Sequence, residues 1–343
     1  MNSFLSKIND KADETLLDML IRYKGSTKIV RTKRYNKPPR MRGYILPDKL
    51  EVYLDEGVRI PLRIASNPAI AIRGNRALLY IRVASVGGDF NITSIVHITI
   101  PIEELKGKMK LKAKELLYPI LPCENVEDPR INPVDYQELY HVRGFDLSKG
   151  AVITFKANLS EDNAKVRLIE LVRFRTRNRE EFILRDYRDT FPLNNKNMIV
   201  RPFIRSMGIG SIFIGPRNGA IVSFEELKPI PELLPQKDEI KIGGNAAAKI
   251  SSNEYLLIYH SVDEYGVYYT YAAVFSNDGE LLSMTKEPII IPNPREYIGR
   301  RPGTVFICGV AKYKDEIIIT AGKDYEVVII YSINEDDLFE KLL

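Results

Sequence analysis

The segment Glu127-Asp128-Pro129-Arg130 places two adjacent carboxylates beside a guanidinium group. The proline restricts the backbone, and the neighbouring charges set the pKa of the carboxyl groups. A carboxyl group held in this way can serve as a general acid or base. The same tetrapeptide is also typical of an ordinary surface turn, so these four residues alone leave the catalytic and the structural interpretations open.

Histidine and cysteine, which also commonly carry chemistry, are scarce in this chain. There are three histidines, His97, His141 and His260, and two cysteines, Cys123 and Cys308, far apart in the sequence. Their number and spacing do not fit a metal site, and we find neither a glycine-rich phosphate loop nor a nucleophile paired with a histidine. We therefore expect no metal and no cofactor. A disulfide stays open, and His97 and His141 are interpreted as structural.

The composition is that of a folded protein with a sizeable core. Of the 343 residues, 45% are hydrophobic and 28% are charged, with a formal net charge of +5. This excludes a disordered chain, and the mild charge permits anionic ligands without demanding nucleic acid. No stretch reaches the roughly 18 apolar residues of a membrane helix, and the charged N-terminus does not resemble a signal peptide. We expect a cytoplasmic protein with no membrane partner.

A basic run covers residues 22–42, with nine lysines and arginines and no acid. Tyr23 and Tyr35 lie within it, and basic residues interleaved with aromatic ones could suit a nucleic-acid surface. Pro38 and Pro39 interrupt the run, and a solvated connector explains the same pattern. We favour the connector and do not expect a nucleic-acid partner.

From about residue 57 the pattern changes to short runs of β-branched, aromatic and aliphatic residues separated by turn signals. Ten such runs lie at 76–83, 96–100, 151–157, 166–174, 211–215, 254–260, 267–275, 304–310, 316–320 and 326–331. Helical spacing is confined to about the first twenty residues, to 101–117 and to the C-terminus. The chain is therefore predicted to be all-β with antiparallel strands, and periodicity leaves two sandwiches and a β-propeller open.

These patterns predict three parts of the chain. They are an N-terminal helix with a basic connector (1–56), one β domain (57–333) and a C-terminal helix (334–343). No low-complexity segment or interdomain linker divides the β region, so a single domain is favoured.

Around the acidic tetrapeptide, further segments in a fixed order resemble the β-mannoside phosphorylases of glycoside hydrolase family 130. The segments are Asn67-Pro68-Ala69 with a strand to Arg82, Phe191-Pro192 with Val200-Arg201-Pro202, Gly243-Gly244 with Tyr259-His260-Ser261, Glu296 with Gly299, Val305-Phe306 with Gly309, and Gly322 with Asp324. The resemblance extends over roughly residues 60 to 335 and depends on the order of the segments rather than on any single one.

The resemblance implies a five-bladed β-propeller that cleaves β-mannosides, or a related β-glycoside, with inorganic phosphate as co-substrate. Phosphate would attack the face opposite the leaving group and give a sugar 1-phosphate with inversion. Loops from every blade would meet at the mouth of the central channel, which explains why the matching residues are spread from position 67 to 324. The terminal helices outside the blades could support a homo-oligomer.

The resemblance also assigns roles to individual residues. Asp128 matches the general acid, whose proton is expected to reach the glycosidic oxygen through a hydroxyl group of the mannose. The residues expected to bind the sugar are Asn67, Arg82, Arg130, Glu296 and Asp324. The residues expected to hold phosphate are the cations Arg201, Lys241 and His260, with Arg188 as a further contact.

The chain departs from the family pattern at several positions, which keeps two alternatives open. Val200 replaces the histidine before Arg201, Ser261 follows His260 in place of glycine, and the glycine-rich stretch lacks its usual prolines. One alternative is an inverting hydrolase, which needs a second carboxylate to activate water, with Glu296 or Glu127 available. The other alternative is a propeller that binds carbohydrate without turnover.

Overall fold

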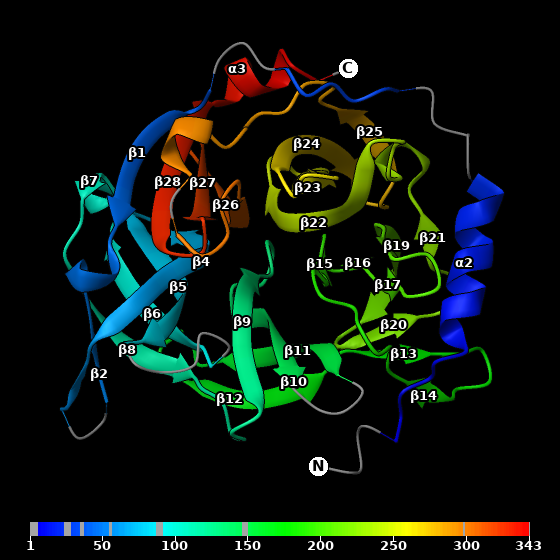
Figure 1. Ribbon diagram of the computed structural model, residues 1–343, viewed down its shortest axis with the longest axis horizontal. Helices are drawn as coiled ribbons and strands as arrows, with labels where there is room; N and C mark the ends of the chain where they lie inside the picture. The colour runs from blue at the N-terminus through cyan, green and yellow to red at the C-terminus, as the bar shows by residue number, and fades with distance from the viewer. Residues whose placement is uncertain are drawn as a thin grey trace.

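The sheets of the protein are arranged around a common centre, as the computed structural model shows (Figure 1). The structure describes residues 6–23, 29–34, 38–54, 57–86, 92–145, 150–297 and 299–342. Within these residues the strands form five sheets. Most neighbouring strands are antiparallel, and four of the sheets also contain one parallel pair. The chain is therefore all-β and propeller-like, and the predicted fold class is confirmed at this level.

The first two sheets contain the tetrapeptide and the strand that carries Asn67. The first sheet runs β3 (Arg59–Ile60), β2 (Leu50–Tyr53), β8 (Leu111–Leu117), β6 (Ser94–Pro101), β5 (Arg76–Ser85) and β4 (Leu62–Arg73). The second sheet runs β12 (Val166–Leu171), β11 (Ala151–Leu159), β10 (Glu138–Phe145) and β9 (Glu124–Ile131). In both sheets the last strand named lies nearest the centre (Figure 1).

The predicted phosphate residues Lys241 and His260 lie on the fourth sheet, whereas Arg188 precedes and Arg201 follows the two last strands of the third. The third runs β14 (Glu181–Phe182), β13 (Arg173–Arg175), β20 (Ile221–Ser223), β19 (Phe213–Asn218), β16 (Asn197–Val200) and β15 (Phe191–Pro192), and β21 (Lys228–Pro229) also pairs with β19. The fourth runs β17 (Phe203–Ile204), β18 (Ile209–Gly210), β22 (Glu239–Lys249), β23 (Glu254–Asp263), β24 (Tyr268–Ser276) and β25 (Leu281–Met284).

The fifth sheet joins the two ends of the chain. It runs β26 (Val305–Tyr313), β27 (Glu316–Lys323), β28 (Val327–Asn334), β1 (Arg40–Ile45) and β7 (Gly107–Lys108). β1 pairs antiparallel with β28, from Arg40 opposite Ser332 to Ile45 opposite Val328. This pairing closes the ring, because an N-terminal strand completes the C-terminal sheet. The strands thus begin before residue 57, and the predicted boundary lies between β2 and β3.

The helices lie outside the sheets. α2 (Ala12–Tyr23) buries Ala12, Leu16 and Leu20, which are four residues apart and share one helix face. These side chains belong to the apolar cluster of the third sheet, together with Phe174 and Phe182. α3 (Glu335–Phe339) follows β28, and the side chain of Asn334 caps its first turn. Within the described ranges, no helix is long and apolar enough to cross a membrane.

Each of the ten predicted runs overlaps a strand, but the predicted helix at 101–117 is wrong. This segment contains the 3-10 helix η2 (Ile102–Glu104), then β7 and β8. In β8, Lys112 and Lys114 are exposed while Ala113 between them is buried, a period of two that suits a strand rather than a helix. The lysines and leucines favour a helix, but the packing of β8 between β2 and β6 overrides this preference.

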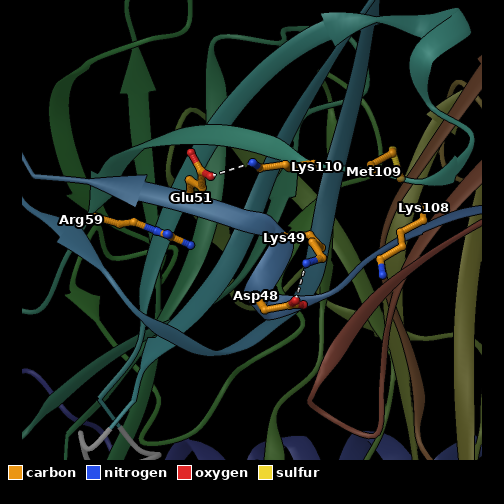
Figure 2. Close-up of a pocket in the computed structure, with 7 residues that line it drawn as sticks. All are labelled: Asp48, Lys49, Glu51, Arg59, Lys108, Met109 and Lys110. Carbon is orange, nitrogen blue, oxygen red and sulfur yellow. Dashed lines mark ion pairs between the residues drawn. The ribbon is translucent and has the colours of Figure 1, made fainter.

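The same segment lines a cavity of about 500 Å³ on the outer strands (Figure 2). Its lining residues are Asp48, Lys49, Glu51, Arg59, Lys108, Met109 and Lys110. Both carboxylates are already paired with lysines, at 2.8 Å for Asp48 and Lys49 and 3.3 Å for Glu51 and Lys110. None of the predicted site residues lines this cavity, so it is separate from the candidate active site.

The basic run at 22–42 is not simply a solvated connector. Arg31 is buried, and its guanidinium lies 2.5 Å from the carboxylate of Glu239 on β22. It also donates to the backbone carbonyls of Glu232 and Leu234. A buried charge is tolerated only when it is paired and hydrogen-bonded, as it is here. Arg31 therefore anchors this part of the run to the fourth sheet, while residues 24–28 and 35–37 lie outside the described residues.

Candidate active site

The innermost strands of four sheets are interrupted close to the centre. The pairing register shifts between Ser66 and Ala69 on β4 and between Glu127 and Arg130 on β9, where β9 pairs with β10. It also shifts between Gly244 and Ala246 on β22 and between Ile307 and Gly309 on β26. A bulge re-aims the side chain at the extra residue and recurs next to active sites. The residues freed in this way include Asn67, Asp128, Asn245 and Cys308. Neither cysteine forms a disulfide.

Two of these residues have left-handed backbone conformations, with φ of 49° at Asn67 and 52° at Asp128. Such conformations are uncommon for residues other than glycine and persist where the surrounding structure enforces them. Gly322 on β27 permits this arrangement, because any Cβ atom there would collide with Asn67 Oδ1 and Ser66 Oγ. The glycine of the last motif thus makes room for the asparagine of the first.

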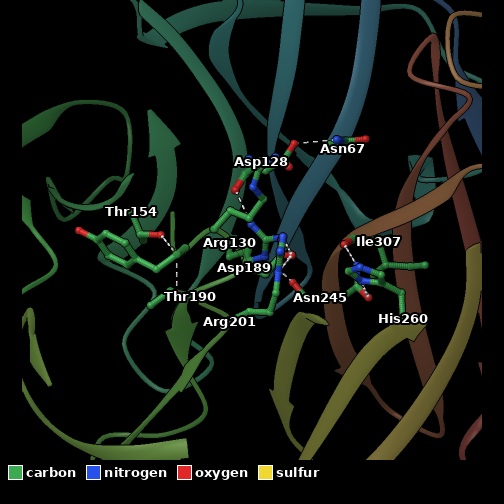
Figure 3. A network of polar contacts seen from close by, with 12 residues as sticks. Asn67, Asp128, Arg130, Thr154, Asp189, Thr190, Arg201, Asn245, His260 and Ile307 are labelled. Carbon is green, nitrogen blue, oxygen red and sulfur yellow. Dashed lines mark hydrogen bonds and ion pairs between the residues drawn. The ribbon is translucent and has the colours of Figure 1, made fainter. Parts of the chain in front are cut away.

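The protein binds the carboxylate of Asp128 through one of its two oxygens, Oδ1 (Figure 3). Its Oδ1 accepts a hydrogen bond from Asn67 Nδ2 at 2.7 Å and another from Arg82 Nη1 at 3.2 Å. Arg82 also lies 2.6 Å from Glu127 through Nη2, so one guanidinium binds both acids. Within the described residues Oδ2 has no hydrogen-bond partner, which leaves this oxygen for a ligand. Asn67 and Arg82, for which the resemblance implies contacts with the sugar, are thus hydrogen-bonded to Asp128 in this structure.

Arg130 supports the backbone of the acid rather than presenting a free guanidinium. Its Nη1 donates to the carbonyl oxygen of Asp128 at 3.0 Å, and its Nε donates to that of Asn245 at 2.7 Å. Its Nη2 lies 2.5 Å from Asp189 Oδ1. The side chain is fully buried, with the rings of Phe191 and Phe306 nearby. The sequence predicts a sugar contact here, whereas all three guanidinium nitrogens contact the protein.

Asp189 is a central residue that the sequence reasoning missed. Its carboxylate joins Arg130 to Arg201, which contacts Asp189 Oδ2 through Nε at 2.9 Å and Nη2 at 2.8 Å. Burial alone would raise the pKa of Asp189, but the Arg201 and Arg130 charges more than offset it and hold that pKa below its usual range. The only sequence signal was an aspartate in the mixed-charge stretch 186–189, too common to single out.

His260 is a neutral histidine in this structure. The side-chain amide of Asn245 donates to the carbonyl oxygen of Ile307 at 2.7 Å, so its Oδ1 faces His260 Nδ1 at 3.0 Å (Figure 3). Nδ1 must then carry the proton, which leaves Nε2 as an acceptor. Burial lowers the pKa of His260 well below its usual value. The resemblance implies a cation here, and burial is the reason that the ring is uncharged.

Cationic side chains gather beside this network. Lys241 Nζ donates to the hydroxyl of Tyr268 at 2.7 Å and lies 4.9 Å from the centre of its ring. Burial, together with the Arg201 and Arg301 charges, lowers the pKa of Lys241 to about 7. The Arg188 charge also lowers the pKa of Lys241, and Arg188 is itself paired with Asp186 at 2.8 Å. The predicted phosphate residues Arg201, Lys241 and Arg188 therefore share one positively charged region.

Glu296 and Asp324 are linked through Lys323. Lys323 Nζ lies 3.1 Å from Glu296 Oε2 and 3.7 Å from Asp324 Oδ2. Asp324 is buried and left-handed, with φ of 50°, and its Oδ1 accepts from the backbone N–H of Thr304 at 3.2 Å. The Glu296 side chain is 58% exposed, which places it at the rim rather than beside the acid. Among the described residues, Glu296 forms its ion pair with Lys323.

A second cavity, of about 490 Å³, borders the charged region. It is lined by Asp186, Arg188, Arg205 and residues of the β9, β10 and β11 ends, including Glu124, Asn125, Phe145 and Val152. Arg188 belongs both to this cavity and to the surroundings of Lys241. Within the described ranges, no three histidine, cysteine or acidic side chains are grouped so that they could hold a metal ion.

The fold and the site together define a class, an all-β, propeller-like protein with a carboxylic acid at its centre and a cluster of cations beside it. The sequence profile of Glyco_hydro_130, described as β-1,4-mannooligosaccharide phosphorylase, matches residues 32–342. The chain therefore belongs to glycoside hydrolase family 130, which confirms the resemblance. No curated protein sequence matches the chain.

Solved structures of this family have a similar fold. The β-1,2-mannobiose phosphorylase of Listeria innocua, in complex with β-1,2-mannobiose, has a TM-score of 0.64 at 17% identity, over 92% of this chain and 99% of that one. MPT-4, a mannose phosphorylase of Leishmania mexicana in complex with a phosphate ion, has a TM-score of 0.53 at 13% identity, over 94% of each chain.

A third structure shows that the family contains two kinds of enzyme. Its title states that the family of mannoside phosphorylases contains glycoside hydrolases that target β-1,2 mannosidic linkages in Candida mannan. It has a TM-score of 0.52 at 12% identity, over 89% of this chain and 97% of that one. At such identities the likeness concerns the fold, so the choice between the two reactions depends on the site.

Proposed function

We propose that the protein is an inverting glycoside phosphorylase that cleaves β-mannosides, or a related β-glycoside, with inorganic phosphate. The observation that carries this proposal is the bridge from Asp128 through Arg130 and Asp189 to Arg201. It connects an acid with one open oxygen to a cluster of cations suited to a dianion. We also propose that the five sheets are the five blades of the predicted propeller, and that the protein works in the cytoplasm.

In the proposed reaction Asp128 supplies the proton and phosphate supplies the nucleophile. Oδ1 is held by Asn67 and Arg82, so Oδ2 is the oxygen that would carry the proton toward the glycosidic oxygen, through a mannose hydroxyl group. A phosphate oxygen attacks the anomeric carbon from the opposite face as the C–O bond to the leaving sugar breaks. The products are the sugar 1-phosphate of inverted configuration and the free acceptor sugar. The protein contributes orientation and charge stabilisation.

The cations favour the binding of phosphate at the position where the nucleophile is needed. Arg201 is paired with Asp189, but Lys241 has no carboxylate partner within the described residues. A buried ammonium without a counter-charge is unfavourable, and an incoming dianion would satisfy it. Neutral His260 can add an acceptor at Nε2 for a protonated phosphate oxygen. This set fits phosphate better than it fits a neutral water molecule.

Sugar release with and without inorganic phosphate tests the proposal directly. Purified protein should convert β-1,2- or β-1,4-linked manno-oligosaccharides to mannose 1-phosphate only when phosphate is present. The product is identified by anion-exchange chromatography and its anomeric configuration by NMR. Release of free mannose at the same rate without phosphate would contradict phosphorolysis.

A specific observation keeps hydrolysis as the second candidate. Of the two carboxylates available as a base, Glu296 lies at the rim, but Glu127 lies beside Asp128 and shares Arg82 with it. Burial raises the pKa of Glu127, which moves it toward the range of a general base. Inverting hydrolysis would use Glu127 to activate water. Loss of phosphate-independent release in Glu127→Gln would support this alternative.

The state of Lys241 predicts how phosphate binding depends on pH. With a pKa of about 7, Lys241 loses its charge above neutrality, whereas phosphate stays a dianion. The KM for phosphate should therefore rise by about 20-fold between pH 7.5 and 9, since the charged fraction of a group with this pKa falls from roughly one quarter to about one hundredth. Initial rates at varied phosphate and saturating mannoside measure this.

The matched variant for this prediction is Lys241→Arg, because arginine keeps its charge over the whole pH range. Its KM for phosphate, whatever its absolute value, should change less than threefold over the same window, by order of magnitude. Lys249→Arg, at the exposed end of the same strand, should behave as the unmodified protein does. Equal slopes in Lys241→Arg and the unmodified protein would contradict the assignment of the titration to Lys241.

A further inference from the structure

Arg301 contacts two tyrosine rings, one of which also contacts Lys241. Its guanidinium carbon is 5.3 Å from the centre of the Tyr268 ring and 5.5 Å from that of Tyr325. Its Nη1 donates to the Tyr325 hydroxyl at 3.3 Å. Stacking on aromatic rings fixes the plane of a guanidinium while leaving its N–H groups available. Arg301 is exposed, so these N–H groups can reach a ligand.

Tyr268 brings Arg301 close to Lys241. The ring of Tyr268 lies within 5.3 Å of both cations, and its hydroxyl accepts a hydrogen bond from Lys241. Neither cation has a carboxylate partner within the described residues. Two neighbouring positive charges repel each other, and the Arg301 charge contributes to the lowered pKa of Lys241. An anion placed between them would relieve this repulsion and make a charge-assisted hydrogen bond to each.

Backbone contacts connect Arg301 to the part of the site that contains the proposed general acid, Asp128. The backbone N–H of Arg301 donates to the carbonyl oxygen of Asp324 at 3.1 Å, and Asp324 and Tyr325 are both left-handed, with φ of 50° and 63°. A left-handed tyrosine is rare and indicates a constraint on this turn. Arg82, which holds Asp128, lies 5.3 Å from the same Tyr325 ring. Tyr325 thus positions Arg301 relative to the general acid.

We propose that Arg301 is an additional phosphate-binding residue. Tyr268 and Tyr325 hold its guanidinium group so that Arg301 and Lys241 both bind the phosphate dianion. This inference rests on the proposed function and adds to it a residue that no motif assigned, in the segment before β26. It makes phosphate capture a joint action of this segment, the strand β22 that carries Lys241, and the residues Arg188 and Arg201 that flank β15 and β16. It also predicts that Arg301 acts on phosphate and not on the mannoside.

The test uses the full chain and inorganic phosphate as the probe. Arg301→Gln should weaken phosphate binding in calorimetry, and raise the KM for phosphate, by about 10- to 100-fold, the usual effect of losing a hydrogen bond to a charged group. The KM for the mannoside should change less than about threefold. Arg301→Lys should recover part of the loss, because it keeps the charge without the planar stacking. Arg295→Gln, exposed on the same segment, is the matched control and should change neither constant.

The outcomes separate this inference from the proposed function. If the unmodified protein binds phosphate and Arg301→Gln binds it equally well, the inference is wrong and the proposed function stands. If both KM values rise together, Arg301 supports the site as a whole and the inference is likewise overturned. If the unmodified protein neither binds phosphate nor needs it for turnover, both the inference and the proposed function are overturned. A selective loss for phosphate supports the inference.

Discussion

Replacing Asp128 by asparagine is expected to slow the cleavage of a β-mannoside by about 10³-fold while leaving the chain folded. Asparagine keeps an oxygen that can accept from Asn67 and Arg82, so the positions of these two residues should be preserved. It cannot donate a proton as a carboxylic acid does. Initial rates of sugar release measure the loss, and the thermal unfolding midpoint checks the fold.

The leaving group gives a sharper version of the same test. A nitrophenyl β-mannoside departs without much help from an acid, so Asp128→Asn should lose far less activity on it than on mannobiose. Asp278→Asn, which affects a highly exposed ion pair with Lys196, is the matched control and should leave both rates unchanged. Equal losses on the two substrates would contradict the role of Asp128 as acid. Unchanged activity of Asp128→Asn on both substrates would contradict the proposed function, which requires this acid.

The parts of the site that could be predicted from sequence are those with a local cause. Asn67 and Asp128 each precede a proline and sit at a strand irregularity. Proline within a sheet is confined to edges and bulges, so these dipeptides mark the interruption in the sequence itself. The ten strand runs were predictable for the same reason, since period and turn signals are local. The order of the motifs then singled out Asp128, Asn67 and Arg82 as site residues, but not the contacts among them.

The contacts that sequence could not reveal join distant parts of the chain. Asp189 is 59 positions from Arg130, and the carbonyl of Asn245 is 115 positions from the same guanidinium. These contacts exist only because the ring closes and brings the inner strands together. No local pattern separates Asp189 from the other acids of its stretch. Burial likewise decides that His260 is neutral, and burial depends on the whole fold.

Tertiary packing also explains the wrong helix at 101–117. Its lysines, leucines and glutamates have high helix propensity, and this preference hid a strand signal, the lysines at every second position from Lys106 to Lys114. The exposed lysines of β8 alternate with buried residues because the strand lies between β2 and β6. Likewise, β1 lies before the predicted start of the β region, because it finds its partner, β28, at the other end of the chain.

Asp189→Asn is expected to destabilise the protein by about 3–5 kcal/mol, more than any other single change of one charge in the site. The aspartate compensates two buried guanidinium groups, Arg130 and Arg201, and a neutral amide cannot do so. The loss should appear in the free energy of unfolding from equilibrium denaturation in urea at pH 7. Activity should fall as well, because Arg130 would no longer be held against the carbonyl oxygen of Asp128.

The stability difference between the unmodified protein and Asp189→Asn depends on pH in a way that follows from the lowered pKa of Asp189. A carboxyl group with a depressed pKa in the folded protein stabilises it fully above its unfolded pKa of about 3.9. The contribution is lost as the pH falls through the lower, folded value. The gap in unfolding free energy between the unmodified protein and Asp189→Asn should therefore be constant from pH 5 to 8 and narrow only below about pH 4.

Two comparisons decide whether the bridging charge is the cause. Asp278→Asn removes a carboxylate of the same type from an exposed pair and should cost less than about 1 kcal/mol. Asp189→Glu keeps the charge and should recover part of the stability, although its extra methylene crowds a buried site. Equal destabilisation in Asp189→Asn and Asp189→Glu would point to packing instead. A loss of stability in Asp189→Asn that Asp189→Glu largely recovers would show that the charge of this carboxylate holds Asp128 and Arg201, the arginine proposed to bind phosphate, in their relative positions.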